Sequence, residues 1–145
     1  MSKVLIDTGP IVALFNQQDR DHKACKKILS NIKGQVFTTS AVLTEVFLFL
    51  SAGSKSWMGV QEWIKAEYLV VKDINSMSQW NDCFSFMNQY KDNPMDFADA
   101  TLVMLAHQLQ SNRIMTLDAN DFSSYKMKSG FAFKSFDIVG LEYLS

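Results

Sequence analysis

Cysteine is scarce in this sequence. The chain of 145 residues has two cysteines, Cys25 and Cys83, which lie far apart and show no CxxC motif or Cys/His clustering. This spacing argues against a disulfide scaffold and against a thiolate metal site. We therefore expect two reduced thiols in a cytoplasmic protein.

Long apolar runs and linker segments are also lacking. The longest apolar stretch, AVLTEVFLFL at 41–50, is too short to span a bilayer and carries Glu45. Only three apolar residues separate Lys3 from Asp7, so we expect no signal peptide and no membrane association. With two prolines, six glycines, no repeat and no Gly/Ser-rich segment, residues 1–145 are expected to form a single domain.

Neither sign of charge dominates the chain. Fourteen Lys and Arg against fifteen Asp and Glu give a formal net charge of -1. This balance argues against a histone-like protein or a basic nucleic-acid-binding tail. It leaves local contacts with nucleic acid open, because those depend on where the charges lie.

Short apolar segments alternate with amphipathic ones along the chain. The predicted strands are Val4–Ile6, QVFTTS (35–40), LVVK (69–72) and RIMTLD (113–118), and FAFKSFDIV (131–139) is β-leaning. Helices are predicted over about 10–15, 19–32, 41–52, 54–66 and 76–90, and from Asn93-Pro94 to Gln110. This alternation predicts an α/β fold around a mostly parallel sheet.

The aromatic residues are expected mainly in the core. Those predicted to be buried are Phe47, Phe49, Trp63 and Trp80. Trp57 is the one that we expect to be exposed. On this interpretation none of the four buried rings serves as a stacking surface for nucleic acid.

Acidic residues stand where the predicted strands end. Asp7 follows Val4–Ile6, Asp118 ends RIMTLD, and Glu45 lies about one turn into the helix after QVFTTS. Ligands of parallel α/β sheets bind beyond the carboxyl ends of the strands. If the strands are parallel, these three acids therefore reach the same edge of the sheet.

Asp99 adds a fourth acid from a helix. It shares a helical face with Leu102, Val103 and Ala106, which is the face that a helix normally buries. An unpaired carboxylate there would cost several kcal/mol or be protonated, and no Lys or Arg lies within a turn of it. A divalent cation such as Mg²⁺ or Mn²⁺, which prefers oxygen ligands, would keep several carboxylates ionised together.

The sequence predicts an acidic cluster of Asp7, Glu45, Asp99 and Asp118, with Asp96 and Asp121 nearby as further metal ligands. Such a site suits phosphodiester hydrolysis, because bound metals activate a water and stabilise the leaving oxygen. Simpler roles stay open. Asp7, Asp118 and Asp121 could cap or support short helices, Glu45 could be a partly exposed helix residue, and Asp96 falls at the third helical position after Asn93-Pro94.

Four segments together resemble the PIN-domain family, and within it the VapC-like toxin ribonucleases of type II toxin–antitoxin systems. They are LIDTGPIVALFN (5–16), TEV (44–46), MDFADATLVMLA (95–106) and TLDANDF (116–122), in the family's order and over nearly the whole chain. The resemblance implies a three-layer α/β/α sandwich and Mg²⁺- or Mn²⁺-dependent endonucleolytic cleavage of RNA.

The resemblance also implies roles and partners. The family's acidic quartet falls on Asp7, Glu45, Asp99 and Asp118, while Asp96 and Asp121 match additional acids. A small antitoxin, a homodimer and a cytoplasmic location are implied in the same way. Two alternatives stay open: a PIN-fold nuclease of RNA maturation, and a non-catalytic RNA-binding or scaffold module.

Two other families share part of the opening motif. Aspartic proteases carry Asp-Thr-Gly, but this chain has a single such motif, at Asp7, and a helical segment follows it. Phosphotransferases of the haloacid dehalogenase type need a second acid two residues after the first, where this chain has Gly9. Neither family fits the rest of the sequence.

Overall fold

A five-stranded parallel sheet forms the centre of the computed structural model, which describes residues 2–92, 95–129 and 132–144. Its strands are β1 (Ser2–Ile6), β2 (Gly34–Thr39), β3 (Leu69–Lys72), β4 (Arg113–Met115) and β7 (Asp137–Ile138), in the order β3-β2-β1-β4-β7. Every neighbouring pair in this sheet is parallel. The predicted α/β class with a mostly parallel sheet is confirmed.

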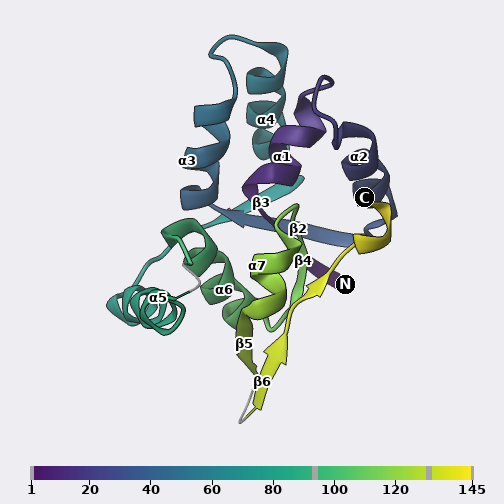
Figure 1. The fold of residues 1–145 in the computed structure, drawn as a ribbon. Helices are drawn as coiled ribbons and strands as arrows, with labels where there is room; N and C mark the ends of the chain where they lie inside the picture. Colours follow the sequence, from purple (N-terminus) through teal and green to yellow (C-terminus); the bar gives the residue numbers. More distant parts are fainter. Residues whose placement is uncertain (1, 93–94, 130–131, 145) are drawn as a thin grey trace.

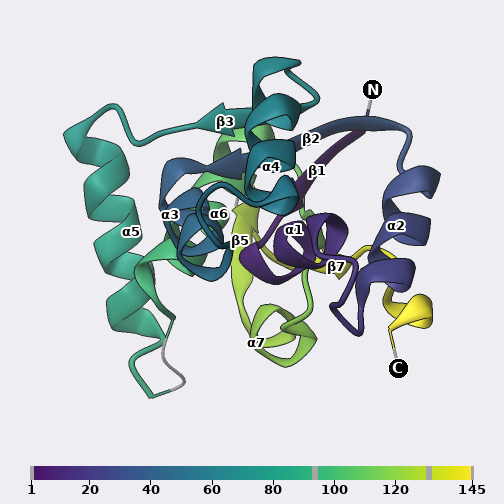
Figure 2. The same cartoon turned by 90° about the horizontal axis from the view of Figure 1, so that it is seen from above.

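Helices cover both faces of the sheet. They are α1 (Thr8–Phe15), α2 (His22–Asn31), α3 (Ser40–Phe49), α4 (Lys55–Lys65), α5 (Met77–Gln89), α6 (Phe97–Leu109) and α7 (Ala119–Ser124), followed by a 3-10 turn at Leu141–Tyr143. Figure 1 shows α1, α2 and α4 on one side of the sheet and α5 and α6 on the other, and Figure 2 shows the same arrangement from above. The three-layer sandwich is therefore as expected.

Side-chain caps explain why three of the helices begin where they do. The hydroxyls of Thr39, Ser54 and Ser76 accept hydrogen bonds from the backbone N–H groups three residues on, at 3.4, 3.1 and 3.2 Å. Each satisfies an N–H group that the first turn of a helix leaves without a backbone partner. The predicted starts of these helices agree with the structure to within one residue.

Helix α6 packs against the sheet and is the most deeply buried helix segment near the site. Its residues Ala98 to Ala106 are all buried. The helix ends at Gln110, whose left-handed backbone (φ 52°) lets its N–H bond back to the carbonyl of the last turn. Because Asp99 lies within this stretch, the prediction that its face is buried is correct.

The start of α6 corrects one prediction. Asn93 and Pro94, expected to open the helix, lie outside the described residues. The helix begins at Phe97, and Asp96 is its N-cap, accepting a hydrogen bond from the Asp99 N–H at 2.8 Å. Asp96 is therefore not at the third helical position, and the capping side chain itself fixes the start.

Several other boundaries differ from the prediction. Strand β4 ends at Met115 rather than at Asp118, and α3 ends at Phe49 rather than near residue 52. The helix expected from residue 19 begins at His22, because Asp19 to His22 form a turn closed by the His22 N–H and the Asp19 carbonyl. The β-leaning segment 131–139 is divided between two sheets, and Phe131 lies outside the described residues. Residues Ala132–Ser135 form β6, which pairs antiparallel with β5 (Lys126–Ser129), a strand that the sequence analysis missed.

The core prediction is wrong for two aromatic residues. Phe49 is 70% exposed and Trp80 is 38% exposed, whereas Phe47 and Trp63 are partly buried against the core. Trp57, expected to be exposed, is also partly buried. The amphipathic pattern of α5 misled this prediction, because in that helix only Cys83 is fully buried.

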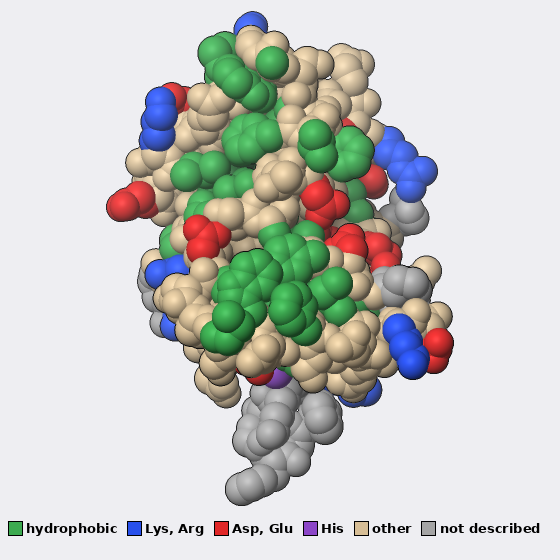
Figure 3. Space-filling model, turned by 90° about the vertical axis from the view of Figure 1, so that its left-hand side faces the viewer, with side chains coloured by type: hydrophobic (Ala, Val, Ile, Leu, Met, Phe, Trp, Pro, Cys, Tyr) green, Lys and Arg blue, Asp and Glu red, His purple; other side chains and the backbone are tan. Residues whose placement is uncertain are grey.

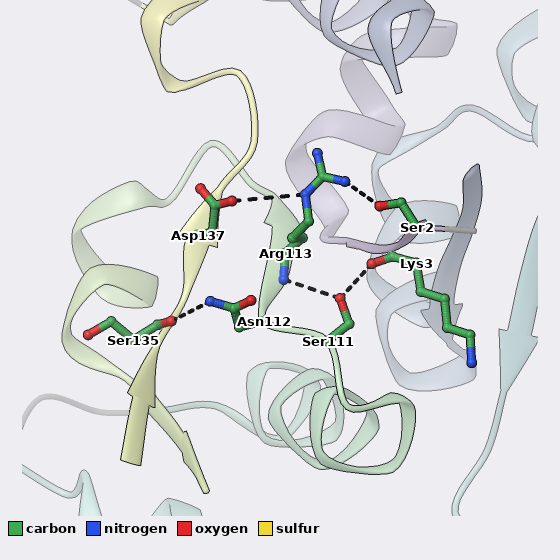
Figure 4. Close-up of polar contacts among 7 residues, drawn as sticks. All are labelled: Ser2, Lys3, Ser111, Asn112, Arg113, Ser135 and Asp137. Atoms are coloured by element: carbon green, nitrogen blue, oxygen red, sulfur yellow. Dashed lines mark hydrogen bonds and ion pairs between the residues drawn. The ribbon is translucent and has the colours of Figure 1, made fainter. Parts of the chain in front are cut away.

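The amino edge of the sheet is closed by polar contacts (Figure 4). Arg113 of β4 donates to the Ser2 hydroxyl of β1 and lies 3.9 Å from the Asp137 carboxylate of β7. The Ser111 hydroxyl donates to the Lys3 carbonyl at 2.6 Å. These bonds hold three strands together at one edge, and the opposite edge carries the acids.

Candidate active site

A hollow of about 560 Å³ lies at the carboxyl edge of the sheet. It is lined by Asp7, Thr8, Gly9, Val12, Asp19, Glu45, Phe49, Asp96, Asp99, Leu117, Asp118 and Asp121. We call this hollow the acidic pocket. The structure thus brings together all six predicted acids and adds Asp19, while no Lys or Arg is among the lining residues that the structure describes.

Asp7 lies between β1 and α1. One of its carboxylate oxygens accepts the Thr8 N–H at 2.8 Å, and the other accepts the Thr116 hydroxyl at 3.0 Å. The pKa of Asp7 is raised to about 6, mainly by burial and to a smaller extent by the charges of Asp96 and Glu45. The two hydrogen bonds act in the opposite direction and lower it. The residue is therefore both the N-cap of α1 and a buried acid of the pocket.

Thr116 joins two of the acids. Its hydroxyl donates to Asp7, and it accepts the backbone N–H of Asp118 at 2.9 Å. The backbone N–H of Asp7 also bonds to the Met115 carbonyl at 3.0 Å. The carboxyl ends of β1 and β4 are fixed to each other by these bonds, which sets the relative position of Asp7 and Asp118.

Asp99 enters the pocket from the first turn of α6. It is 8% exposed, and burial together with the charges of Asp7 and Asp96 raises its pKa to about 8. The Tyr125 hydroxyl donates to its Oδ2 atom at 3.3 Å. Tyr125 is fully buried, and burial beside Asp99 raises the pKa of this phenol, which therefore stays a donor.

Glu45 and Asp96 line another part of the acidic pocket. Glu45 is half-buried on α3, and burial followed by the charge of Asp96 raises its pKa. The Thr8 hydroxyl lies close enough to Glu45 to oppose this rise. That hydroxyl is buried and makes no hydrogen bond of normal geometry within the part of the chain that the structure describes. The Thr8 hydroxyl therefore lies beside Glu45 in the lining of the pocket.

Asp118 and Asp121 come from the turn into α7. Asp118 stands at the N-cap position of α7, and the backbone N–H of Asp121 lies close enough to its carboxylate to lower its pKa, so the capping role considered for it stays open. Burial of its carboxylate and the neighbouring Asp121 raise the pKa of Asp118 to about 6. Asp121 lies in the first turn of α7, where a negative charge favours the helix, so its capping role and its place in the pocket coexist.

Three features of this site were not identified from the sequence. Asp19 was predicted only as the first residue of the helix at 19–32, so nothing marked it as an acid of the pocket. Tyr125 follows α7 and reaches Asp99, 26 positions away in the chain. The exposure of Phe49 was hidden because an apolar residue in an apolar helix reads as core.

The donor set of the pocket fits a hard divalent cation. It offers carboxylates, one unpaired hydroxyl and no nitrogen or sulfur ligand, which is the chemistry that Mg²⁺ and Mn²⁺ prefer. Over the described ranges, no three or more His, Cys, Asp or Glu side chains are gathered as a finished ligand set. The acids line a hollow with room for water and substrate, as suits an ion that keeps several of its waters.

The buried charge of Asp99 predicts a pH-dependent stability of the metal-free protein. Its pKa is near 3.8 when unfolded and about 8 when folded, so the folded state keeps a proton that the unfolded state releases. The free energy of unfolding therefore falls as pH rises from about 4 to about 8. In EDTA at pH 8, we expect Asp99→Asn to be more stable by about 1–3 kcal/mol, or about 3–9 °C in Tm by calorimetry.

The difference between the Asp99→Asn variant and the unmodified chain should shrink toward zero near pH 4, where both side chains are neutral. Asp82→Asn is the matched control, because Asp82 is exposed on α5 and its loss should leave Tm unchanged at both pH values. A lower Tm of Asp99→Asn at pH 8 would mean that the ionised carboxylate is stabilised in the fold, contrary to this account.

No helix among the described residues is long and apolar enough to cross a membrane. Several solved structures are similar to this chain, and two of them are VapC20 and a toxin–antitoxin complex. The VapC20 toxin of Mycobacterium tuberculosis, which cleaves the sarcin–ricin loop, has a TM-score of 0.71 at 17% identity over 81% of this chain and 91% of that one. A toxin–antitoxin complex from Klebsiella pneumoniae has a TM-score of 0.61 at 20% identity, over 83% and 91%. At these identities the likeness shows the fold.

No curated protein matches the sequence. The family description "PIN domain" does match it, over residues 4–127, which include every acid of the pocket. This match covers most of the chain and agrees with the two structural likenesses. The chain therefore belongs to the PIN-domain family.

Proposed function

We propose that this chain is a metal-dependent endoribonuclease that hydrolyses phosphodiester bonds of RNA and acts as the toxin of a toxin–antitoxin pair in the cytoplasm. The observation that carries the proposal is the acidic pocket itself. Four carboxylates with raised pKa values, those of Asp7, Glu45, Asp99 and Asp118, line one hollow. Their lining partners include no Lys or Arg within the described residues, so a cation is the group that would keep them ionised.

In this proposal Asp7, Glu45, Asp99 and Asp118 hold Mg²⁺ or Mn²⁺, with Asp96 and Asp121 as further ligands. The metal, when bound, supplies an activated water and stabilises the leaving oxygen. The chain's own residues fix the geometry. Thr116 and the Thr8 N–H hold both oxygens of Asp7, and Tyr125 holds Oδ2 of Asp99.

The helices contribute to the binding of phosphate. Helices α1 and α6 both begin beside the pocket, at the N-caps Asp7 and Asp96. The amino end of a helix carries partial positive charge, which favours an anion there. This field offsets part of the repulsion among the carboxylates and favours the phosphodiester in a pocket that basic side chains do not line.

Cleavage of a mixed pool of single-stranded RNA by the purified protein tests the enzyme. We expect cleavage with Mn²⁺ or Mg²⁺ and none with EDTA. The cleavage rate of Asp99→Asn should fall by more than the roughly 10–100-fold that is typical when a hydrogen-bond partner of a metal ligand is removed. Tyr125→Phe should fall within that range and recover at higher Mn²⁺, because it loosens a ligand without removing it.

Two controls accompany this assay. Tyr90→Phe removes the hydroxyl of the tyrosine whose ring lies 5.1 Å from that of Tyr125, and should leave the Mn²⁺ requirement unchanged because that hydroxyl bonds to the Lys126 backbone. Asp82→Asn should cleave normally. Metal-dependent cleavage that persists in Asp99→Asn would show that the activity does not come from this site.

The proposed antitoxin covers exposed apolar side chains of α3 and α4. Leu48 at the end of α3 is 79% exposed and Met58 on α4 is 47% exposed. Figure 3 shows hydrophobic side chains gathered on one face of the molecule at the heights that α3 and α5 have in Figure 1, with acidic side chains between them. Exposed apolar areas beside a functional pocket favour a protein partner, and a partner there would block access to the pocket.

Growth measurements test the toxin role. Expression of the chain should arrest growth, Asp99→Asn should not, and co-expression of the small protein encoded beside it should restore growth. The small protein expressed alone is the control for its own effect on growth. Normal growth with soluble, active nuclease would exclude a toxin and favour a nuclease of RNA maturation.

We also propose a homodimer through α5. Met77, Trp80 and Phe84 are 70%, 38% and 48% exposed on this helix, and Trp80 stacks on Phe97 with ring centres 5.4 Å apart. By light scattering we expect about twice the chain mass of 16.5 kDa, and about 16.5 kDa for Met77→Glu with Phe84→Glu. Tyr68→Glu, at a residue 72% exposed away from α5, should stay dimeric. A monomer in all three cases would reject this interface.

A further inference from the structure

The acidic pocket has an apolar side that a metal centre does not explain. Beside the carboxylates it is lined by Val12, Phe49 and Leu117. Phe49 is 70% exposed at the end of α3, next to Leu48, which is 79% exposed, whereas Val42, Leu43 and Val46 of the same helix are buried. The pocket thus has two chemically different walls, one of carboxylates and one of apolar groups.

The position of Phe49 is fixed by the same helix that carries Glu45. The two residues are four positions apart on α3, so they lie on one face, and both line the pocket. Val46 is fully buried and Leu50 is 7% exposed, which anchors the end of the helix on either side of Phe49. An aromatic ring is therefore held about one turn from a proposed metal ligand.

This arrangement matches the two parts of a nucleotide. The phosphodiester belongs at the carboxylates and their cation, and the base attached to the same nucleotide must lie within a few ångströms of it. An aromatic ring offers a stacking surface for any base and none for a phosphate. Because no Lys or Arg lines the pocket among the described residues, phosphate contacts to basic side chains are not what orients the strand there.

We propose that Phe49, supported by Val12 and Leu117, forms a base-binding subsite in which a nucleobase next to the cleaved phosphodiester of single-stranded RNA stacks on the Phe49 ring. This inference rests on the proposed nuclease function. It adds a substrate contact that sets which nucleotide enters the pocket. Purines, with the larger π surface, should be favoured over pyrimidines at this position.

The test is steady-state cleavage of a short single-stranded RNA that the unmodified chain cuts at one site, and of the same RNA with an abasic nucleotide on either side of that site. We expect Phe49→Ala to raise KM about tenfold, within the roughly 5–150-fold that loss of one stacked base implies. With the unmodified chain, one of the two abasic substrates should show the same rise in KM as Phe49→Ala shows with the intact RNA. With Phe49→Ala, the KM for that abasic substrate should rise no further. Phe49→Trp should keep the low KM.

Tyr68→Ala removes an equally exposed aromatic ring away from the pocket and should leave KM unchanged. Mn²⁺ affinity by calorimetry and Tm should be the same in Phe49→Ala as in the unmodified chain, because the ring touches substrate and not metal or core. These readouts separate loss of a base contact from damage to the metal site or to α3.

Two results would overturn the subsite while leaving the nuclease intact: an unchanged KM in Phe49→Ala, or equal losses on the intact and both abasic substrates. If Phe49→Ala abolished antitoxin binding with KM unchanged, the ring would be a protein contact only. If the unmodified chain neither bound nor cleaved RNA with Mn²⁺, the proposed function itself would fail, and the subsite with it.

Discussion

The mutual repulsion of carboxylates in one partly buried pocket is the constraint on which the rest of this structure depends. Asp7 and Asp99 are at most 9% exposed, and their burial raises the pKa of both. The charge of Asp7 further raises the pKa of Asp99 and of Asp118. The fold offsets this repulsion only in part, through the Thr8 N–H, the Thr116 hydroxyl and the Tyr125 hydroxyl. A protein that gathers these charges without cationic side chains gives up stability at neutral pH, and the binding of a cation would restore it.

The two ends of the parallel strands have different roles: contacts at the amino ends stabilise the sheet, and the carboxyl ends carry the acids of the pocket. At the amino edge, Arg113, Ser111 and their partners bind β1, β4 and β7 to one another. At the carboxyl edge, the Asp7 N–H and the Thr116 hydroxyl tie β1 to β4 while leaving the carboxylates turned to the pocket. A site with unfavourable electrostatics can be held in place because the strands that carry it are fixed elsewhere.

The sequence was informative where a side chain's position follows from local periodicity. Asp7 and Asp118 could be placed because strand ends are readable, and Asp99 because its helical spacing put a charge on a buried face. Tyr125 and Asp19 could not be placed, since each reaches the pocket through a turn whose path depends on tertiary packing. Phe49 was assigned to the core because apolarity alone does not tell which side of a helix the fold leaves uncovered. The β5–β6 hairpin was missed because its first strand, Lys126–Ser129, has no apolar run.

The position of Phe49 follows from the same constraint as the acids. Glu45 must face the pocket to join the other carboxylates, and α-helical geometry then turns the residue four positions later toward the same hollow. A polar residue there would be the less costly choice for an exposed site, whereas this chain carries one of its largest apolar side chains. An aromatic ring beside anionic groups gains little from them, whereas a nucleobase that entered the pocket would bury its face. In the proposed subsite, the base attached to the bound phosphodiester would cover the exposed Phe49 ring on the side of the pocket that Val12 and Leu117 line.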